Sequence, residues 1–177
     1  MEKSKLRDFE RELRKFVKGD VYFDKVTLGM YSTDASIYQI TPVAVVIPVD
    51  EDDVRAAVAF VRDKALPAVD LAGYSFGAWV NAGVAAEKCT PIESMMMVSP
   101  PVGFIEFEND NALSCLKLVV TGSRDDIAPP DRIRALLPTW NPDAQFEIID
   151  GCDHFYSGQL DNLQAILTSF LQSPKKQ

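Results

Sequence analysis

The sequence predicts an α/β fold with three layers, in which a mostly parallel sheet of about five or six strands lies between helices. From residue 68 onward, short apolar runs alternate with segments of helical periodicity. Those runs are continuously apolar, as expected of parallel strands that are covered on both faces. The chain has 177 residues, 47% of them hydrophobic and 25% charged, which indicates a packed domain rather than a disordered chain.

The elements expected in the first part of the chain are an amphipathic helix over 1–18, a strand over 21–28, a loop over 32–40, a buried strand over 41–49 and a helix over 50–65. The last of these has the clearest start signal. Asp50 or Asp52 can cap it, and the acidic residues that follow suit the positive end of the helix dipole.

The elements expected in the second part are strands over 68–75, 94–100, 116–122 and 145–151, and helices over 76–88, 129–137 and 160–171. Proline in the first turn suits the helix over 129–137. The two parts, 1–67 and 68–173, are expected to pack as one unit. If the sheet is truncated on one side, the N-terminal part must cover its edge.

Composition excludes several functions. The net charge of −8 and the pI of about 4.6 argue against nucleic-acid binding, because phosphates would be repelled. No apolar run reaches the length of a membrane span, and the first residues lack the apolar core of a secretory signal. The 3 cysteines are widely spaced, which predicts a reducing cytoplasm with neither a disulfide framework nor a metal site. The cysteines and the run Met95-Met96-Met97 are expected to fill strands and core.

The pentapeptide GYSFG, residues 73–77, follows the G-x-S-x-G pattern between a predicted strand and a predicted helix. In that context the serine sits on a sharp turn, and the two glycines are expected to let the strand and the helix approach closely. The turn would present the Ser75 hydroxyl above the sheet. It would also aim the Phe76 N–H, at a helix N-terminus, toward a developing oxyanion.

A serine nucleophile needs a base and an acid that orients the base. The only histidine, His154, follows the strand predicted over 145–151. Asp125 and Asp126 follow the strand predicted over 116–122. The order Ser, Asp, His, each just beyond a strand, is typical of one class of hydrolase. Each residue also has a structural interpretation: a loop histidine, an aspartate turn or helix cap, and a small residue in a tight turn.

Residues 69–172 resemble the C-terminal part of a small α/β-hydrolase. The motifs that carry this resemblance are GYSFG, GSRDDIAP, GCDHF and VSPPV. The resemblance implies that Ser75 is the nucleophile, Asp125 the acid and His154 the base. Asp125 is preferred to Asp126 because the family pattern is Gly-x-x-Asp with proline four residues on.

Aromatic residues surround these motifs. Tyr74, Trp79 and Phe155 are expected to form an apolar site for the acyl group of a small-molecule substrate, together with Phe76 and Phe104. The alternative is that they are core residues.

Residues 19–67 resemble a different family, the FAD-linked oxidases related to glycolate and lactate oxidase subunits. The resemblance rests on YSTDASIYQ, on the strand with the pattern P-x-x-V-x-P and on the helix that starts DEDDV. In that family a glycine-rich loop that binds the FAD pyrophosphate comes next. Here AVDLAGYSFG follows instead, so the loop is absent and we expect no bound FAD.

The junction between the two resemblances, at residues 67 and 68, affects the catalytic rate that the sequence predicts. An α/β-hydrolase normally takes a second oxyanion donor from a loop before the elbow, and residues 1–67 contain neither His-Gly nor Gly-Gly to supply it. Loss of one donor slows acyl transfer by about 100- to 1000-fold. The sequence therefore predicts a serine hydrolase that cleaves an ester, thioester or amide. The alternatives are a weak or inactive chimeric or structural protein and a flavin-binding oxidase fragment.

Overall fold

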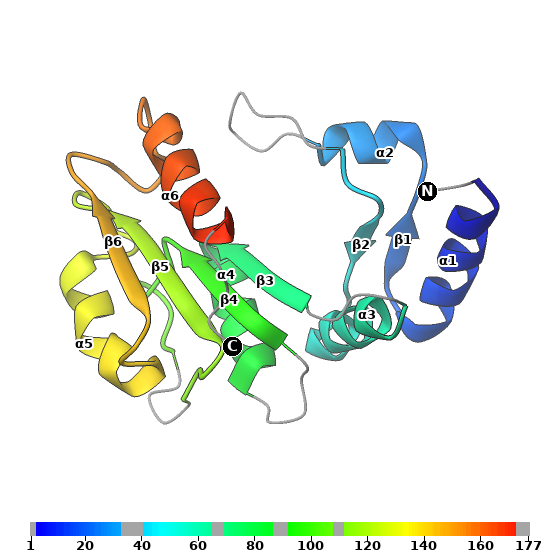
Figure 1. Cartoon of the computed structure of the whole chain (residues 1–177), viewed down its shortest axis with the longest axis horizontal. Coiled ribbons are helices and arrows are strands. Elements are labelled where there is room, and N and C mark those ends of the chain that lie inside the picture. The colour runs from blue at the N-terminus through cyan, green and yellow to red at the C-terminus, as the bar shows by residue number, and fades with distance from the viewer. Residues whose placement is uncertain (1–2, 33–40, 65–68, 87–91, 108–111, 173–177) are drawn as a thin grey trace. The chain divides into compact units, whose positions relative to one another are not determined.

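The computed structural model describes residues 3–32, 41–64, 69–86, 92–107 and 112–172. The chain divides into two compact units, Met1–Val69 and Asp70–Gln177 (Figure 1). Each unit has its own hydrophobic core. The predicted boundary between residues 67 and 68 lies outside the described residues, as does all but Ser32 of the loop expected over 32–40. In the described part of the chain, no helix has both the length and the apolar character needed to cross a bilayer.

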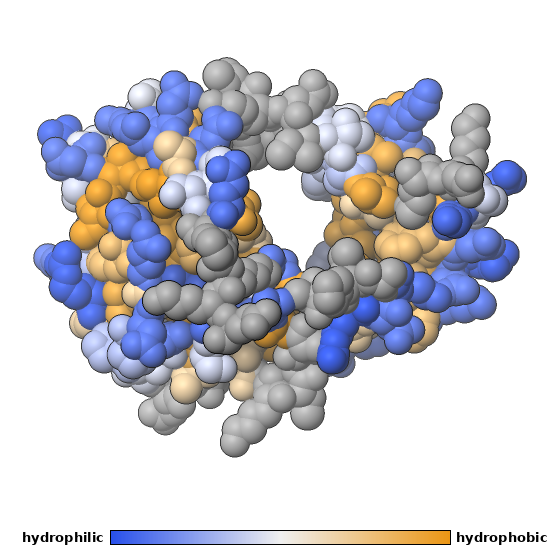
Figure 2. Space-filling view, in the orientation of Figure 1, coloured by the Kyte–Doolittle hydropathy of each residue, from blue (hydrophilic) through white to orange (hydrophobic). Residues whose placement is uncertain are grey.

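The first unit contains helix α1 (Lys3–Phe16), strand β1 (Asp20–Tyr22), helix α2 (Lys25–Met30), strand β2 (Val45–Ile47) and helix α3 (Glu51–Asp63). β1 and β2 form an antiparallel pair. α1 and α3 pack together on a core that includes Leu13, Val21 and Phe60. Figure 2 shows apolar side chains (orange) at the surface of this unit over its two strands.

Two predictions for this unit are wrong. The strand expected over 21–28 ends at Tyr22, because the Asp24 carboxylate accepts the N–H groups of Val26 and Thr27 and so starts α2. The strand expected over 41–49 shrinks to β2 and is only partly buried, with Val45 8% and Ile47 42% exposed. Among the described strands, β2 pairs with β1 alone.

The start of α3 follows the sequence prediction, since the Asp50 side chain accepts the Asp53 N–H at 3.0 Å. The buried Asp53 carboxylate also makes hydrogen bonds that hydrophobic periodicity does not predict. It accepts the N–H groups of Lys18, Gly19 and Val49 at 2.7, 2.9 and 2.9 Å. One side chain thus joins the segment after α1 to the start of α3.

We expect the stability of the first unit to fall in acid through Asp53. Hydrogen bonds from the Val49 and Lys18 N–H groups lower the pKa of Asp53 below its ordinary value of 3.8. A carboxyl whose folded-state pKa is lowered contributes its full stability above the unfolded value and loses it as the pH falls through the folded one. The protection factors for hydrogen exchange at the Lys18 and Gly19 amides should therefore fall in that window.

Two variants test the role of Asp53. In Asp53→Asn the amides of Lys18 and Gly19 should exchange faster already at neutral pH, because an amide NH₂ group now faces backbone donors. Asp52→Asn is the matched control, since Asp52 lies on the same helix turn with a side chain that is 72% exposed. Unchanged exchange in Asp53→Asn would contradict this account.

The second unit contains strand β3 (Val69–Tyr74), helix α4 (Phe76–Ala86), strands β4 (Ile92–Val98) and β5 (Leu116–Gly122), helix α5 (Pro130–Trp140), strand β6 (Gln145–Ile149) and helix α6 (Leu160–Gln172). The sheet order is β3-β4-β5-β6, and β5 pairs in parallel with both β4 and β6. The predicted α/β class is therefore confirmed. The expected five or six strands are four among the described residues, because β1 and β2 pair with each other.

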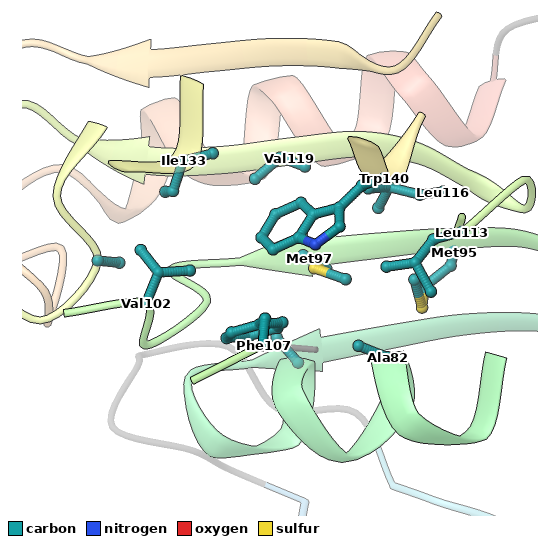
Figure 3. Close-up of a cluster of buried hydrophobic side chains, with 12 residues drawn as sticks. Ala82, Met95, Met97, Val102, Phe107, Leu113, Leu116, Val119, Ile133 and Trp140 are labelled. Atoms are coloured by element: carbon teal, nitrogen blue, oxygen red, sulfur yellow. The ribbon is translucent and has the colours of Figure 1, made fainter. Parts of the chain in front are cut away.

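Helices cover both faces of the four-stranded sheet. On one face, Met95 and Met97 of β4 pack with residues of α4 and α5, among them Ala82 and Ile133 (Figure 3). On the other face, Met96 and other buried residues of β4, β5 and β6 pack against α6. The methionine run thus fills core on both sides of β4, as its alternation along a strand requires. Because β4, β5 and β6 pair in parallel, their carboxyl ends meet at one edge of the sheet.

Candidate active site

Ser75 occupies the turn between β3 and α4 with a φ angle of 52°, in the left-handed region that non-glycine residues rarely adopt. Its N–H donates to the Val98 carbonyl at 2.9 Å, and its carbonyl accepts the Ala78 N–H at 2.9 Å. The surrounding hydrogen bonds thus hold a strained backbone at the serine, as expected of a functional turn. Phe76, whose N–H is predicted to face the oxyanion, is the first residue of α4.

The two glycines of GYSFG differ in what they permit. A Cβ atom at Gly73 would lie 2.5 Å from the Gly77 carbonyl oxygen and 2.6 Å from the Ala78 nitrogen, so only glycine lets β3 approach α4 this closely. A Cβ atom at Gly77 would meet nothing within 4 Å. The expectation that both glycines serve close approach is therefore wrong for Gly77.

This difference predicts opposite outcomes for two alanine variants. Gly73→Ala should destabilise the second unit by about 1–3 kcal/mol, because the new methyl group collides with backbone that cannot rotate away. Gly77→Ala should have a free energy of unfolding within about 1 kcal/mol of the parent, since alanine is a better helix former. Chemical denaturation of both variants measures the difference. Equal stabilities would show that the close approach at Gly73 is not required.

His154 contacts both other predicted triad residues. Its Nε2 lies 2.9 Å from the Ser75 Oγ, and its Nδ1 lies 2.9 Å from each carboxylate oxygen of Asp125. Because a carboxylate can only accept, Nδ1 carries the proton and Nε2 is free to accept the serine hydroxyl proton. His154 and Asp125 are buried, at 7% and 2% exposure. The three side chains form one continuous hydrogen-bonded chain.

The Asp125 carboxylate is fixed by its own loop. Its Oδ1 accepts the N–H groups of Ile127 and Ala128 at 3.0 and 2.7 Å, and the Thr121 hydroxyl lies 3.4 Å from Oδ2. These donors satisfy a buried carboxylate while leaving it directed at the imidazole. The neighbouring Asp126 is exposed. The structure thus brings Asp125, and not Asp126, to His154.

The loop that carries His154 is tied to the loop that carries Asp125. The Arg124 N–H donates to the Cys152 carbonyl and the Ser123 N–H to the Ile149 carbonyl, both at 2.9 Å. A Cβ atom at Gly122 would collide with the Cys152 carbonyl, so glycine at the end of β5 permits this approach. The ends of β5 and β6 therefore set the distance between the acid and the base.

The aromatic residues predicted to bind substrate are partly exposed and lie next to the triad in sequence. Phe155 is 66% exposed, with its ring edge-on to His154 at 5.5 Å between centroids. The Trp79 ring lies 5.4 Å from the exposed Phe76 ring, and its Nε1 donates to the Glu106 carbonyl. Tyr74 is 46% exposed and stacks against His154 instead of lying free.

A cavity of about 530 Å³ lies between residues 102–107 and α5. The residues that line it are Val102, Gly103, Phe104, Ile105, Glu106, Phe107, Arg132, Ala135 and Leu136. Phe104 is the only one of the predicted aromatic residues in this lining. The cavity is thus separate from the side chains that contact His154.

Sequence reasoning missed a buried pair, Ser99 and Tyr156. Their hydroxyl oxygens are 2.7 Å apart, and both residues have a positive φ, of 46° and 56°. Burial raises the pKa of the Tyr156 hydroxyl further above its ordinary value of 10.0. The pair joins the end of β4 to the histidine loop. The available signal was the position of Ser99 directly after β4, whereas Tyr156 lies within the loop that follows β6.

No group of three or more His, Cys, Asp or Glu side chains in the described ranges is arranged to hold a metal ion. The described cysteines, Cys115 and Cys152, are free thiols that are partly or fully buried, and Cys89 lies outside the described residues. Burial raises the pKa of both described thiols. The groups that the candidate site offers for chemistry are therefore the Ser75 hydroxyl, the His154 imidazole and the Asp125 carboxylate.

Comparison with solved structures identifies the fold. An α/β serine hydrolase homologue from Coxiella burnetii matches with a TM-score of 0.59 and 27% identity over 68% of this chain. A Xanthomonas campestris α/β serine hydrolase without lid matches with a TM-score of 0.57 and 27% identity over 70% of this chain. The chain carries an α/β-hydrolase-like fold. It spans 58% of the length of each of these two solved structures.

Est1E from Butyrivibrio proteoclasticus shares the fold at 16% identity, with a TM-score of 0.57 over 68% of this chain and 67% of its own. No family model and no curated protein matches the sequence. The solved structures support the predicted resemblance to hydrolases. They give no support to the resemblance of residues 19–67 to FAD-linked oxidases, which stays a prediction.

Proposed function

We propose that the chain is a serine hydrolase that cleaves an ester, thioester or amide through an acyl-enzyme. One observation carries the proposal: the hydrogen-bonded chain from the Ser75 hydroxyl through the His154 imidazole to the Asp125 carboxylate, with 2.9 Å at each link. The strained Ser75 backbone and the similarity to solved α/β-hydrolases support it.

In the proposed reaction, the Ser75 Oγ attacks the substrate carbonyl carbon and its proton passes to the His154 Nε2. Asp125 stays ionised and stabilises the imidazolium through the Nδ1–H. The tetrahedral intermediate collapses when Nε2 returns the proton to the leaving group, which departs as an alcohol, thiol or amine. Water then attacks the acyl-enzyme by the same route, releasing the acid and regenerating Ser75.

The oxyanion that forms in both steps needs hydrogen-bond donors. We propose the Phe76 N–H as one of them, because it lies at the N-terminus of α4, where backbone N–H groups are unpaired and the helix dipole favours negative charge. A hole with one donor instead of two would lower the rate by about 100- to 1000-fold. We therefore expect modest turnover.

We propose that Trp79 and Phe155, with part of the Tyr74 ring, contact the acyl group. These rings are partly exposed, and they lie on the segments that carry Ser75 and His154. They favour an apolar acyl group over a charged one. We further propose a cytoplasmic enzyme with no cofactor, no nucleic-acid partner and no membrane partner. A purified protein that shows flavin absorbance would contradict the cofactor proposal.

The test is hydrolysis of a short p-nitrophenyl ester by the purified chain, with the release of nitrophenolate recorded as a function of ester concentration. The proposal predicts saturable hydrolysis that the Ser75→Ala variant lacks. Hydrolysis that is equal in both proteins, or absent from a folded parent, would contradict the proposal. It would support the alternative of a weak or inactive chimeric or structural protein.

A further inference from the structure

His154 is contacted by Tyr74 in addition to Ser75, Asp125 and Phe155. The Tyr74 hydroxyl donates to the His154 backbone carbonyl at 2.9 Å. The Tyr74 ring also stacks on the imidazole, with 5.4 Å between centroids and 30° between planes. One side chain therefore restrains both the backbone and the ring of His154.

These contacts matter because the histidine lies in a loop. Residues 150–159 between β6 and α6 contain no helix or strand, so regular backbone hydrogen bonds do not fix the position of His154. Asp153 turns the loop by accepting the N–H groups of Phe155 and Ser157, and Tyr156 anchors its far side to Ser99. Tyr74, the last residue of β3, reaches this loop from the strand that leads to the serine.

We propose that Tyr74 is a positioning residue, which holds the His154 imidazole in line between Asp125 and Ser75. This inference rests on the proposed function of that site. The sequence places Tyr74 directly before Ser75, so the residue that restrains the base is covalently tied to the nucleophile. Its ring face also lies within the distance at which an aromatic ring stabilises a cation, which favours the imidazolium that forms during the reaction.

Purely structural packing is a poorer account of Tyr74. The side chain is 46% exposed, and leucine at this position would keep part of the apolar contact that the ring makes, including the contact with Tyr156. If Tyr74 served stability alone, its loss would change the free energy of unfolding slightly and leave the imidazole unaffected. If it positions His154, its loss should affect the imidazole and the rate with little effect on stability.

The chain contains 1 histidine, so nitrogen-15 NMR of the imidazole reports on His154 without assignment. In the parent we expect the proton on Nδ1 to give a strongly downfield proton signal that is protected from exchange with water, because this proton is hydrogen-bonded to Asp125. In Tyr74→Leu the signal should broaden or disappear through exchange with water. Tyr74→Phe, which keeps the ring, should retain it. Tyr31→Leu, at an exposed tyrosine of the first unit, should match the parent.

Reaction with a fluorophosphonate at Ser75 gives the kinetic readout, separated into a maximal rate and a half-saturating probe concentration. Tyr74→Phe should lower the maximal rate about 3- to 10-fold, as expected for one lost hydrogen bond. Tyr74→Leu should lower it about 10- to 100-fold, because the ring contact is lost as well. Phe155→Leu should instead raise the half-saturating concentration, since Phe155 is proposed to contact the ligand.

The outcomes separate this inference from the proposed function. A parent that shows the protected imidazole signal but no labelling would contradict the proposed hydrolase and leave the positioning inference supported if Tyr74→Leu loses the signal. An unchanged signal in Tyr74→Leu would overturn the inference, as would a change confined to the half-saturating concentration. A parent without the protected signal would also overturn it.

Discussion

Replacing Ser75 by alanine is expected to abolish hydrolysis of a p-nitrophenyl ester and to leave the second unit folded. The Ser75 hydroxyl is the only group that His154 Nε2 contacts among the described side chains, so the variant has no nucleophile at the base. The hydrolysis rate is expected to fall by at least about 1000-fold. The size of the loss depends on how fast the parent is and on the rate enhancement that substrate binding alone still gives in the variant. Alanine keeps the backbone donor and acceptor that hold the turn.

The control is Ser114→Ala, at an exposed serine away from the triad, which should retain full activity. Circular dichroism of both variants should match the parent, because neither removes buried apolar surface. Retention of more than about a tenth of the activity in Ser75→Ala would place the reaction at another group.

Asp125→Asn is expected to lower the rate by about 10⁴-fold with little change in structure. The amide oxygen can still accept the Ile127 and Ala128 N–H groups, so the loop should hold. The amide NH₂ would then face His154 Nδ1 and favour the tautomer with the proton on Nε2. That tautomer cannot accept the Ser75 proton. The relevant measurement is the maximal rate of fluorophosphonate labelling at Ser75.

Asp126→Asn is the matched control for this variant. Asp126 is the adjacent residue and is exposed. Among the described contacts, the hydrogen bond to His154 comes from Asp125 and not from Asp126. It should label at the parent rate. Equal losses in the two variants would contradict the assignment of the acid to Asp125, and no loss in Asp125→Asn would contradict a role for the carboxylate.

The geometry of the site could be predicted because parallel strands impose it. Asp125 and His154 follow neighbouring strands, β5 and β6, whose carboxyl ends must lie at the same edge of the sheet. Ser75 follows β3 at a strand-to-helix turn, which the GYSFG pattern indicates. Sequence order on alternating strands and helices therefore carries information about distance in space.

The contacts of Tyr74 and Tyr156 could not be predicted in this way. Tyr156 meets Ser99 across 57 residues of sequence, and Tyr74 meets His154 across 80. Neither pair has a motif, because the contacts depend on loop conformations with positive φ at Ser99 and Tyr156. An aromatic residue beside a motif indicates a ligand site equally well, so the sequence predicts a substrate contact for Tyr74 and not a contact with His154.

The first unit departs furthest from its prediction, and the reason is local. Its apolar runs resemble strands of the main sheet, but Asp24 starts a helix inside one of them. Asp53 accepts the Val49 N–H just after β2, so that group bonds to a side chain instead of continuing the strand. Single side-chain hydrogen bonds of this kind override hydrophobic periodicity over short segments.

The central claim is that Ser75, His154 and Asp125 act together as an acyl-transfer site. Its most direct test is labelling of the purified chain with a fluorophosphonate, followed by mass spectrometry to locate the modified residue. We expect modification at Ser75 that is lost in the His154→Ala variant. A folded protein that remains unlabelled, or labelling at Ser75 that persists without His154, would contradict the claim.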